Sequence, residues 1–570
     1  MAPKTKLELT WIGKDQRPRL EPRILVEDPT RAYHAATRRS EKDIFDNRLI
    51  FGDNLLALKA LEQEFAGKVK CVFIDPPYNT GSAFEHYDDG IEHSLWLSLI
   101  RDRIELLRSL LSETGTLWIT IDDNECHYLK VVCDEVFGRQ NFVTSFAWEK
   151  DEGRRGDTHI SVAHDHILLY AKRFDAWRVQ RNLLPRTAAH DARYKNPDND
   201  PRGPWLQGDN GTAKSGSDKL RYPIELPSGR KVVPPAGNYW RFSTDTLAKA
   251  LEDGRVWFGK TGDSLPIIKR YLSGVQDGLV PRTWWPADDV GSNQEAKRDH
   301  LRKLLPDIEP FATPKPERLF TFILHIATNP GDLVLDSFAG SGTTGAVAHK
   351  MGRRWIMVEL GEHCHTHIIP RLKKVVDGED PGGITDAAGW KGGGGFRYYR
   401  LAPSLLEKDR FGNWIISKQY NAAMLAEAMC KLEGFTYAPS ETEYWQHGRS
   451  TEHDFVYVTT QTLGREDLER LSDDVGPRRT LLVLCGAFRV RNPDDFSNLT
   501  VKKIPKAVMA RCEWGKDDYS LEIRDLPAAV ADPAAAKPEP TKATPRGRTK
   551  ADRRAQGDLF GASPKPTGKT

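Results

Sequence analysis

The segment LVLDSFAGSGTTG, at residues 333–345, decides the fold class of this chain. Its three apolar residues lead to Asp336, and glycines follow at positions 340, 342 and 345. Glycine lets a backbone turn tightly and leaves no Cβ in the way of a ligand, so the pattern predicts a strand, a ligand-binding turn and a helix. The segment alone predicts a nucleoside site in a Rossmann-like sheet. A glycine turn that only joins strand to helix is the alternative.

Other short apolar runs, each leading to an acidic residue, stand before and after this segment. They lie at residues 48–51, 71–74, 116–121 and 355–358, with helical patterns at 95–111 and 316–327. Such runs are typical of buried parallel strands whose carboxyl ends carry function. The alternation of strands and helices therefore predicts an α/β fold with a doubly wound, mostly parallel sheet.

Glu359 stands at the end of the strand predicted over 355–358. A carboxylate at this place can accept hydrogen bonds from both hydroxyl groups of a ribose. Because NAD fits a glycine turn and a strand-end acid as well as other nucleosides do, these two features leave the choice of cofactor open.

A second motif, DPPYNTG at residues 75–81, stands at the end of another predicted strand. The paired prolines Pro76 and Pro77 fix a rigid loop with its carbonyl groups pointing outward. If the Asp75 carboxylate and the Pro76 carbonyl each accept one N–H of a planar amine, the nitrogen lone pair is freed to attack an electrophilic methyl group, and Tyr78 can stack on the ring. The alternative is a proline turn whose Asp caps a helix.

These motifs and their order resemble the β class of amino-group DNA methyltransferases, and most closely the modification subunit of type III restriction-modification systems. In that class the catalytic loop precedes the cofactor loop, as it does here. The likeness spans about residues 45–402. The matching segments are 49–58, 75–81, 115–125, 290–297, 313–319, 336–344 and 394–398. Since no Pro-Cys pair occurs in the chain, covalent attack on a cytosine ring carbon is disfavoured.

The resemblance implies S-adenosyl-L-methionine as cofactor and a catalytic tetrad of Asp75, Pro76, Pro77 and Tyr78 in a methyltransferase core. The residues that it implies for the cofactor are Asp53, Thr313, Lys315, Asp336, Phe338, Gly340, Gly342, Thr343 and Glu359. Of these, the Asp336 turn would cradle the methionine portion, Glu359 the ribose, Asp53 the adenine, and Thr313 with Lys315 the carboxylate end. The chemistry requires no metal.

The resemblance also implies a substrate, namely adenine in double-stranded DNA at a specific site. An Asp at the start of the tetrad favours adenine over cytosine in this group. A duplex buries the target amine, so we expect the base to be flipped into a pocket beneath Tyr78. A role in restriction-modification or a related phage defence follows from the same likeness.

Residues 176–310 interrupt the alternation of strands and helices, with many prolines, glycines and tryptophans. We interpret this stretch as an insertion that reads the DNA sequence, because basic and aromatic side chains alternate in it. The residues expected to contact DNA are Arg181, Arg186, Arg193, Lys195, Arg202, Lys214, Lys219 and Arg221. Arginine-rich loops are also ordinary solvated surface.

The whole chain divides into six predicted parts. These are an N-terminal extension (1–44), the catalytic half of the core (45–175), the recognition insertion (176–310), the cofactor half of the core (311–402), a small α/β domain (403–527) and a disordered tail (528–570). The tail holds nine Lys and Arg against four Asp and Glu, in a chain of net charge +3. The body is therefore not a polycation, and a DNA surface must be a local groove.

Four predictions concern partners and location. Family likeness implies a homodimer and a helicase-nuclease partner that docks on residues 403–527. The tail peptide at 556–560, with Gln556, Leu559 and Phe560, resembles the motif that binds the replication sliding clamp, although Gly557 stands where Leu is usual. The N-terminus lacks an apolar signal stretch and no long apolar run occurs, so a cytoplasmic protein is expected.

Two histidine groups and four rival functions complete the predictions. Residues 363–367 (HCHTH) favour a surface helix over a metal site, and His164 with His166 favours a strand entry over an acid/base dyad. The seven cysteines lack any Cys-x-x-Cys spacing and are expected to be reduced.

The rival functions are the same chemistry on cytosine, the same chemistry on RNA or a protein amide, an NAD-dependent oxidoreductase, and a non-catalytic DNA-binding subunit.

Overall fold

The structure is a computed structural model. It describes residues 8–78, 93–153, 159–206, 211–275, 278–504, 508–509 and 511–520, together with the backbone of two short strands, β5 (Ala83–Phe84) and β6 (Tyr87–Asp88). The predicted disordered tail and its peptide at 556–560 lie outside the described residues.

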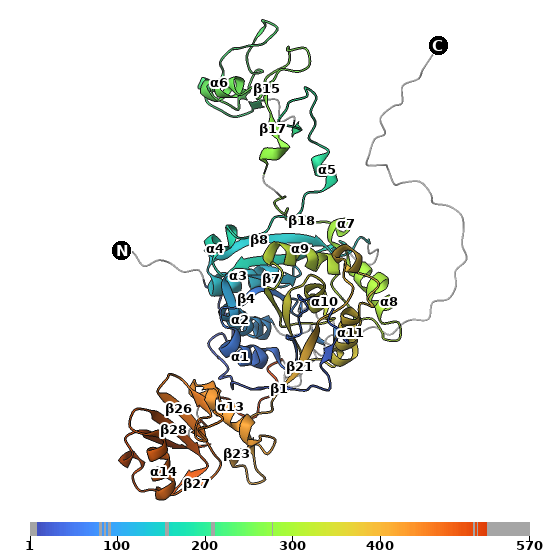
Figure 1. The fold of residues 1–570 in the computed structure, drawn as a ribbon. Helices are drawn as coiled ribbons and strands as arrows, with labels where there is room; N and C mark the ends of the chain where they lie inside the picture. The colour runs from blue at the N-terminus through green and yellow to red at the C-terminus, as the bar shows by residue number, and fades with distance from the viewer. Residues whose placement is uncertain are drawn as a thin grey trace, which may run out of the picture. The chain divides into compact units, whose positions relative to one another are not determined.

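An 11-stranded, mostly parallel sheet forms the centre of the fold (Figure 1). Its strands, in order of pairing, are β1 (Leu25–Glu27), β21 (Gly395–Leu401), β3 (Asn47–Phe51), β20 (Arg354–Glu359), β19 (Leu333–Asp336), β4 (Val69–Ile74), β7 (Leu111–Ile121), β9 (His164–Ala171), β8 (Phe142–Glu149) and β18 (Trp284–Trp285), with β2 (Tyr33–His34) beside β21. All pairs from β21 to β7 are parallel, whereas β9 runs antiparallel to β7 and β8. The predicted α/β fold and its five strands are confirmed.

Helices cover both faces of this sheet, as a doubly wound fold requires. They are α1 (Asn54–Phe65), α2 (His93–Leu110), α3 (Cys126–Phe137), α9 (Glu317–Ala327), α10 (Thr343–Lys350) and α11 (Ile369–Asp377). Successive side chains of a strand point to opposite faces, so neighbouring residues of β4 serve two cores. Val72 lies in a buried cluster with Leu58 of α1 and Ile100 of α2, and Phe73 lies in another with Ile323 of α9. The helices predicted over 95–111 and 316–327 are confirmed by α2 and α9.

The stretch between β9 and β18 contains small antiparallel ribbons instead of sheet strands. Its elements are α4 (Phe174–Arg178), α5 (Ala188–Asp191), β10 (Trp205–Leu206), β11 (Thr212–Ala213), β12 (Ile224–Glu225), β13 (Lys231–Val232), β14 (Tyr239–Trp240), α6 (Thr244–Glu252), β15 (Val256–Trp257), β16 (Ile267–Ile268) and β17 (Arg270–Tyr271). A small core of its own forms around Trp240, with Ile224, Val232 and Leu247 buried against it. Before α9 the chain continues through α7 (Ala287–Val290), the π-helix η4 (Glu295–Leu301) and α8 (Arg302–Leu304).

Beyond β21 the chain forms a second, five-stranded sheet. Its strands are β24 (Thr436–Tyr437), β25 (Gly448–Arg449), β26 (Asp454–Val458), β28 (Thr480–Cys485) and β30 (Leu499–Lys503), accompanied by α13 (Ala422–Glu433) and α14 (Arg465–Val475). The bounds of the six predicted parts stay predictions.

One local prediction is wrong. Residues 363–367 do not form a surface helix, because His363, Cys364 and His367 are buried at the π-helix η5 (Cys364–Ile368) that leads into α11. His367 donates its Nε2–H to the carbonyl of Glu309, and His363 packs on the ring of Phe311. The sequence did not predict this burial, because the segment is polar. Imidazole rings can nevertheless pack in the interior like aromatic side chains.

The seven cysteines are all free, and six of them are buried, which agrees with the reduced state expected for them. In the described part of the chain, no helix combines the length and the apolar character that crossing a membrane needs.

Candidate active site

Two predicted loops meet at one edge of the central sheet. Asp75 follows β4 and Asp336 ends β19, and these strands are parallel neighbours, with Leu335 opposite Val72. A cavity lies between the loops. It is lined by Phe73, Asp75, Phe311, Thr313, Lys315, Phe320, Asp336, Phe338, Ala339, Gly340, Ser341, Thr343 and Thr344. The fold thus brings Asp75 together with most of the residues predicted to hold the cofactor.

The Asp75 carboxylate is held by three donors from three parts of the chain. Its Oδ1 atom accepts hydrogen bonds from the Tyr78 hydroxyl at 2.9 Å and from Thr120 Oγ1 at 2.5 Å. Its Oδ2 atom pairs with the Lys315 ammonium. Since the Asp75 side chain is still 23% exposed, the anchored carboxylate can accept a further hydrogen bond from a ligand in the cavity.

Tyr78 lies between Asp75 and a second, buried carboxylate. Its hydroxyl is 3.5 Å from Asp165 Oδ2, and its ring lies 5.5 Å from the Lys315 ammonium. Burial, with the charges of Asp165 and Asp75, raises the pKa of Tyr78 well above its ordinary value. The phenol therefore stays protonated and acts as a donor. Lys150 binds Asp165 Oδ1 at 2.5 Å and compensates its charge.

The rest of the tetrad is fixed by a tryptophan. Trp96 of α2 is fully buried and donates its indole N–H to the Pro77 carbonyl at 2.7 Å. A buried donor on the loop backbone limits its movement, which supports the rigid loop expected from the two prolines.

Asp336 organises the glycine turn from within. One carboxylate oxygen accepts the backbone N–H of Phe338 at 2.9 Å, and the other accepts the Thr344 hydroxyl. Gly340 and Gly342 have φ values of +52° and +74°, a region that other residues rarely adopt. The turn therefore needs glycine at both positions, as the sequence pattern predicts.

The protonation of Asp336 provides a test of this burial. Burial, opposed by the hydrogen bonds from Thr344 and Phe338 and aided by the charges of Asp75 and Glu359, raises its pKa from 3.8 to about 7. A carboxyl group with a raised pKa destabilises the fold when ionised, and this penalty is relieved as the pH falls from above 7 towards 4. We expect the free energy of unfolding of Asp336→Asn to exceed that of wild type. This excess should be roughly 2 kcal/mol larger at pH 8 than at pH 5.

Urea unfolding at the two pH values, with circular dichroism as the readout, measures this difference. Asp299→Asn is the matched control, because that carboxylate is exposed. A pH-independent difference between Asp336→Asn and wild type would show that Asp336 is ionised throughout.

Glu359 ends β20 beside the same turn. Its Oε2 atom accepts the backbone N–H of Gly340 at 2.8 Å, and its Oε1 atom accepts those of Leu360 and Gly361 at 2.9 Å. Burial raises its pKa, but the neighbouring His363 and these N–H groups outweigh burial and hold the pKa below its usual value. The carboxylate is therefore ionised, as an acceptor for hydroxyl groups requires.

Asp53 has structural contacts in addition to its predicted role. Its carboxylate caps α1 by accepting the N–H of Leu56 at 3.0 Å, and it also accepts the N–H of Tyr519 at 3.1 Å and pairs with Arg103 at 3.3 Å. It does not line the cavity. The neighbouring Asn54 connects it to the glycine turn through a 2.7 Å bond to the Ser337 carbonyl. Its contact with a cofactor adenine stays a prediction.

A buried ionic network supports the turn from behind. Arg371 donates to Thr343 Oγ1 at 2.8 Å and to the Ser341 carbonyl at 3.1 Å, and its other nitrogen binds Glu317 at 2.9 Å. Lys350 of α10 then joins Glu317 to a further carboxylate, Asp380. The network spans α9, α10 and α11, and it fixes where the turn begins relative to the helices.

Several of these residues were not predicted from the sequence. They are Phe73, Thr120, Lys150, Asp165, Phe311 and Arg371. Thr120 stands near the end of β7, beside β4, and Asp165 near the start of β9, beside β7, and these strand-end positions are the one signal that would have marked them. The Lys315 ammonium binds Asp75, a contact that the sequence did not predict. Its predicted contact with the cofactor carboxylate stays a prediction.

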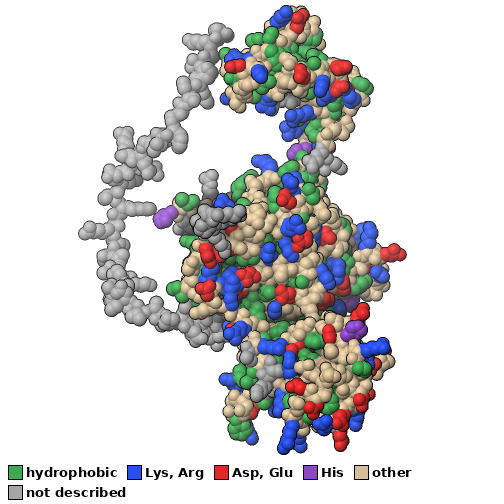
Figure 2. Space-filling model, turned by 90° about the vertical axis from the view of Figure 1, so that its left-hand side faces the viewer, with side chains coloured by type: hydrophobic (Ala, Val, Ile, Leu, Met, Phe, Trp, Pro, Cys, Tyr) green, Lys and Arg blue, Asp and Glu red, His purple; other side chains and the backbone are tan. Residues whose placement is uncertain are grey.

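The eight basic residues predicted to contact DNA fall into three groups. Arg181 is half-buried and donates a hydrogen bond to the Arg178 carbonyl. Arg186 pairs with Asp191 and Arg202 pairs with Asp200, so part of their charge is compensated within the chain. Arg193, Lys195, Lys214, Lys219 and Arg221 are exposed. Figure 2 shows Lys and Arg interspersed with Asp and Glu on the face that it draws, in keeping with the near-neutral body.

A Rossmann-like α/β sheet, with an acidic glycine turn and an Asp-Pro-Pro-Tyr loop on one cavity, defines the class of protein. The family model described as DNA methylase matches residues 69–370, and the chain belongs to this family. Membership of this family is confirmed as predicted, and it sets aside the NAD-dependent oxidoreductase.

Named relatives agree with this family. The chain is 30% identical to the probable type III restriction-modification enzyme HindVI Mod subunit of Haemophilus influenzae, over 66% of this chain and 56% of that protein. It is 31% identical to the StyLTI Mod subunit of Salmonella typhimurium, over 59% and 55%. The chain thus spans about half the length of these relatives. Among solved structures, the PvuII cytosine-N4-specific DNA methyltransferase is 16% identical over 59% of this chain and 89% of its own, with a TM-score of 0.32.

Proposed function

We propose that this chain transfers a methyl group from S-adenosyl-L-methionine to the exocyclic amine of adenine in double-stranded DNA, at a specific site. The observation that carries the proposal is the shared cavity, on which the anchored Asp75 carboxylate and the Asp336 turn both lie. An amine hydrogen-bonded to Asp75 would then face a cofactor bound at the turn. Family membership supports the same chemistry.

The residues of the turn fit the proposed cofactor. Gly340 lines the cavity and has no side chain, so its backbone is open to a close approach, whereas a side chain at Gly342 would meet Ile368. The ionised carboxylate of Glu359 at the end of β20 suits ribose hydroxyls. When bound, S-adenosyl-L-methionine supplies an electrophilic methyl group. Thr313 and Lys315 line the same cavity and are proposed for its carboxylate end.

The catalytic step rests on the residues around Asp75. Its carboxylate, already oriented by Thr120 and Tyr78, accepts one N–H of the amine, and the Pro76 carbonyl accepts the other. The nitrogen lone pair would form the new N–C bond while the methyl–sulfur bond of the cofactor breaks and leaves its electron pair on the sulfur, and Asp75 would stabilise the positive charge that develops on the nitrogen. The surplus proton then passes through Asp75 to water. Tyr78 offers its ring to the base after flipping.

Incubation of the full chain with labelled cofactor tests the proposal. Plasmid DNA should take up label into N6-methyladenine, which nucleoside analysis identifies after digestion, and an active adenine methyltransferase serves as positive control. Label in N4-methylcytosine would show that cytosine is the target base, and label in RNA or protein would show that another polymer is the substrate. No label on any of these polymers would leave a non-catalytic DNA-binding subunit and would overturn the proposal.

The exposed basic residues of the insertion should carry the DNA affinity. Replacing Arg193, Lys214 and Lys219 by alanine together is expected to weaken binding of duplex DNA about tenfold or more and to lower its salt dependence, since each lost phosphate contact removes about one counterion from the slope. Fluorescence anisotropy at several salt concentrations measures both. The matched control replaces Lys408, Arg449 and Arg478, which are exposed within residues 403–527; an equal loss in both variants would place the DNA elsewhere.

Three further proposals rest on the likeness to Mod subunits or on the tail. They are a homodimer, a helicase-nuclease partner that docks on residues 403–527, and a sliding clamp bound through Gln556, Leu559 and Phe560. Light scattering of the purified chain tests the first, and co-purification with a partner encoded beside it tests the second. For the third, Leu559→Ala/Phe560→Ala should lose capture of purified clamp; equal capture would reject it.

A further inference from the structure

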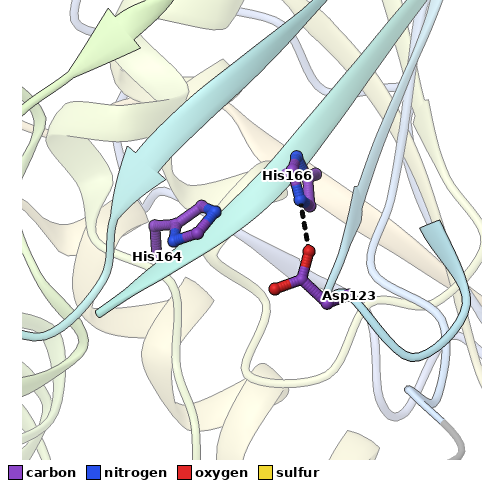
Figure 3. Close-up of side chains that lie close together, drawn as sticks. All are labelled: Asp123, His164 and His166. Carbon is purple, nitrogen blue, oxygen red and sulfur yellow. Dashed lines mark hydrogen bonds and ion pairs between the residues drawn. The ribbon is translucent and has the colours of Figure 1, made fainter. Parts of the chain in front are cut away.

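A histidine and aspartate cluster lies near the active site but outside its cavity. Asp123 follows the end of β7, and His164 and His166 begin β9. These strands are antiparallel neighbours, with Ile121 opposite His166, so their ends meet. His164 and His166 are two residues apart in a strand and therefore share one face. Figure 3 shows the three side chains gathered at the start of β9.

The three side chains offer metal-ligand atoms at close range. His166 Nε2 lies 2.8 Å from Asp123 Oδ1, and one ligand atom from each of the three residues lies within 4.8 Å of the others. Around a tetrahedral Zn²⁺ with bonds near 2.1 Å, neighbouring ligand atoms are about 3.4 Å apart. The Asp123 side chain is 56% exposed, so it can turn by the small amount that closes this geometry.

We propose that Asp123, His164 and His166 bind one divalent transition-metal ion, with water completing the coordination. Two imidazoles and one carboxylate form a ligand set that suits ions such as Zn²⁺. An ion there would join the end of β7 to the start of β9. Asp165, between the two histidines, contacts Tyr78, so the ion would also steady the strand that carries this carboxylate.

A simpler reading of the cluster is a surface ion pair between His166 and Asp123. That pair requires nothing of His164, whose ring lies 5.1 Å from that of His166 between centroids. The two readings therefore differ in what the removal of His164 does.

A second group with similar spacing serves as an internal contrast. His300, Glu317 and Asp380 also bring potential ligand atoms together. The Lys350 ammonium lies 2.7 Å from Glu317 Oε2 and 2.6 Å from Asp380 Oδ2, in the place that an ion would take. A cation is thus already provided by the protein in that group, whereas the Asp123 cluster faces solvent.

The test is a titration of the full, chelator-treated chain with Zn²⁺ in a calorimeter. Wild type should bind one equivalent of Zn²⁺, and so should the control His453→Ala, which changes an exposed histidine elsewhere. His164→Ala and Asp123→Asn should bind Zn²⁺ at least about tenfold more weakly. Zinc should also raise the Tm of wild type and the control more than that of the two variants. Because Asp123 is exposed, Asp123→Asn tests the site even if His164→Ala fails to fold. Equal affinity in wild type and Asp123→Asn, or no bound equivalent in wild type, would overturn the proposal.

Discussion

Replacing Asp75 by alanine is expected to abolish methyl transfer and to leave cofactor binding largely intact. The carboxylate is the group that accepts the amine N–H in the proposed step, and losing such preorganised electrostatic stabilisation costs about a hundredfold to a thousandfold in rate. The substitution leaves the glycine turn untouched. It also frees the Lys315 ammonium, which now binds Asp75, for the carboxylate end of the cofactor. Single-turnover transfer to DNA and calorimetric binding of S-adenosyl-L-methionine measure the two effects.

Two further variants distinguish the roles of charge and position at this loop. Asp75→Asn keeps an acceptor oxygen but loses the charge, and it should retain more activity than Asp75→Ala. Thr120→Val removes one of the hydroxyl groups that orient the carboxylate, and we expect a loss of about tenfold in rate with unchanged cofactor affinity. If Asp75→Ala instead loses the cofactor and Thr120→Val does not, the loop belongs to the cofactor site.

Replacing Lys350 by methionine is expected to lower the free energy of unfolding by about 3 to 5 kcal/mol. The Lys350 ammonium joins Glu317 and Asp380, and all three side chains are 0% exposed. Without it, one carboxylate faces the other in a buried site with only Arg371 and His300 left to compensate them. Against burial, which raises it, Arg371 and Lys350 hold the pKa of Glu317 below its usual value. Chemical unfolding followed by circular dichroism measures the loss.

A surface pair provides the matched control for this prediction. Lys130 binds Asp134 at 2.7 Å with side chains 31% and 20% exposed, so Lys130→Met should cost no more than about 1 kcal/mol. Because Arg371 of the network also holds Thr343 and Ser341, Lys350→Met should weaken cofactor binding as well. Equal stability losses in the two variants would mean that the buried network is solvated.

The sequence by itself determined the sheet, its order of motifs and the two loops. Short apolar runs such as 71–74, each leading to an acidic residue, favour buried strands over helices, because buried helices are usually longer. Glycine at 340 and 342 follows from backbone geometry, with φ values that other residues rarely adopt. Asp75 and Asp336 then stand at strand ends, where parallel strands place functional residues. These features are local in the chain, and local patterns record them.

Tertiary structure alone decided which side chains complete the site. Lys315 reaches Asp75 across a separation of 240 residues, and Tyr519 reaches Asp53 across 466. Asp165 approaches Tyr78 because β9 runs antiparallel beside β7, a pairing that periodicity does not reveal. A polar residue such as Lys350 is buried because partners from distant segments, Glu317 and Asp380, satisfy it. Hydrogen bonds and ion pairs of this kind depend on where strands and helices meet in space, and so a single sequence does not record them.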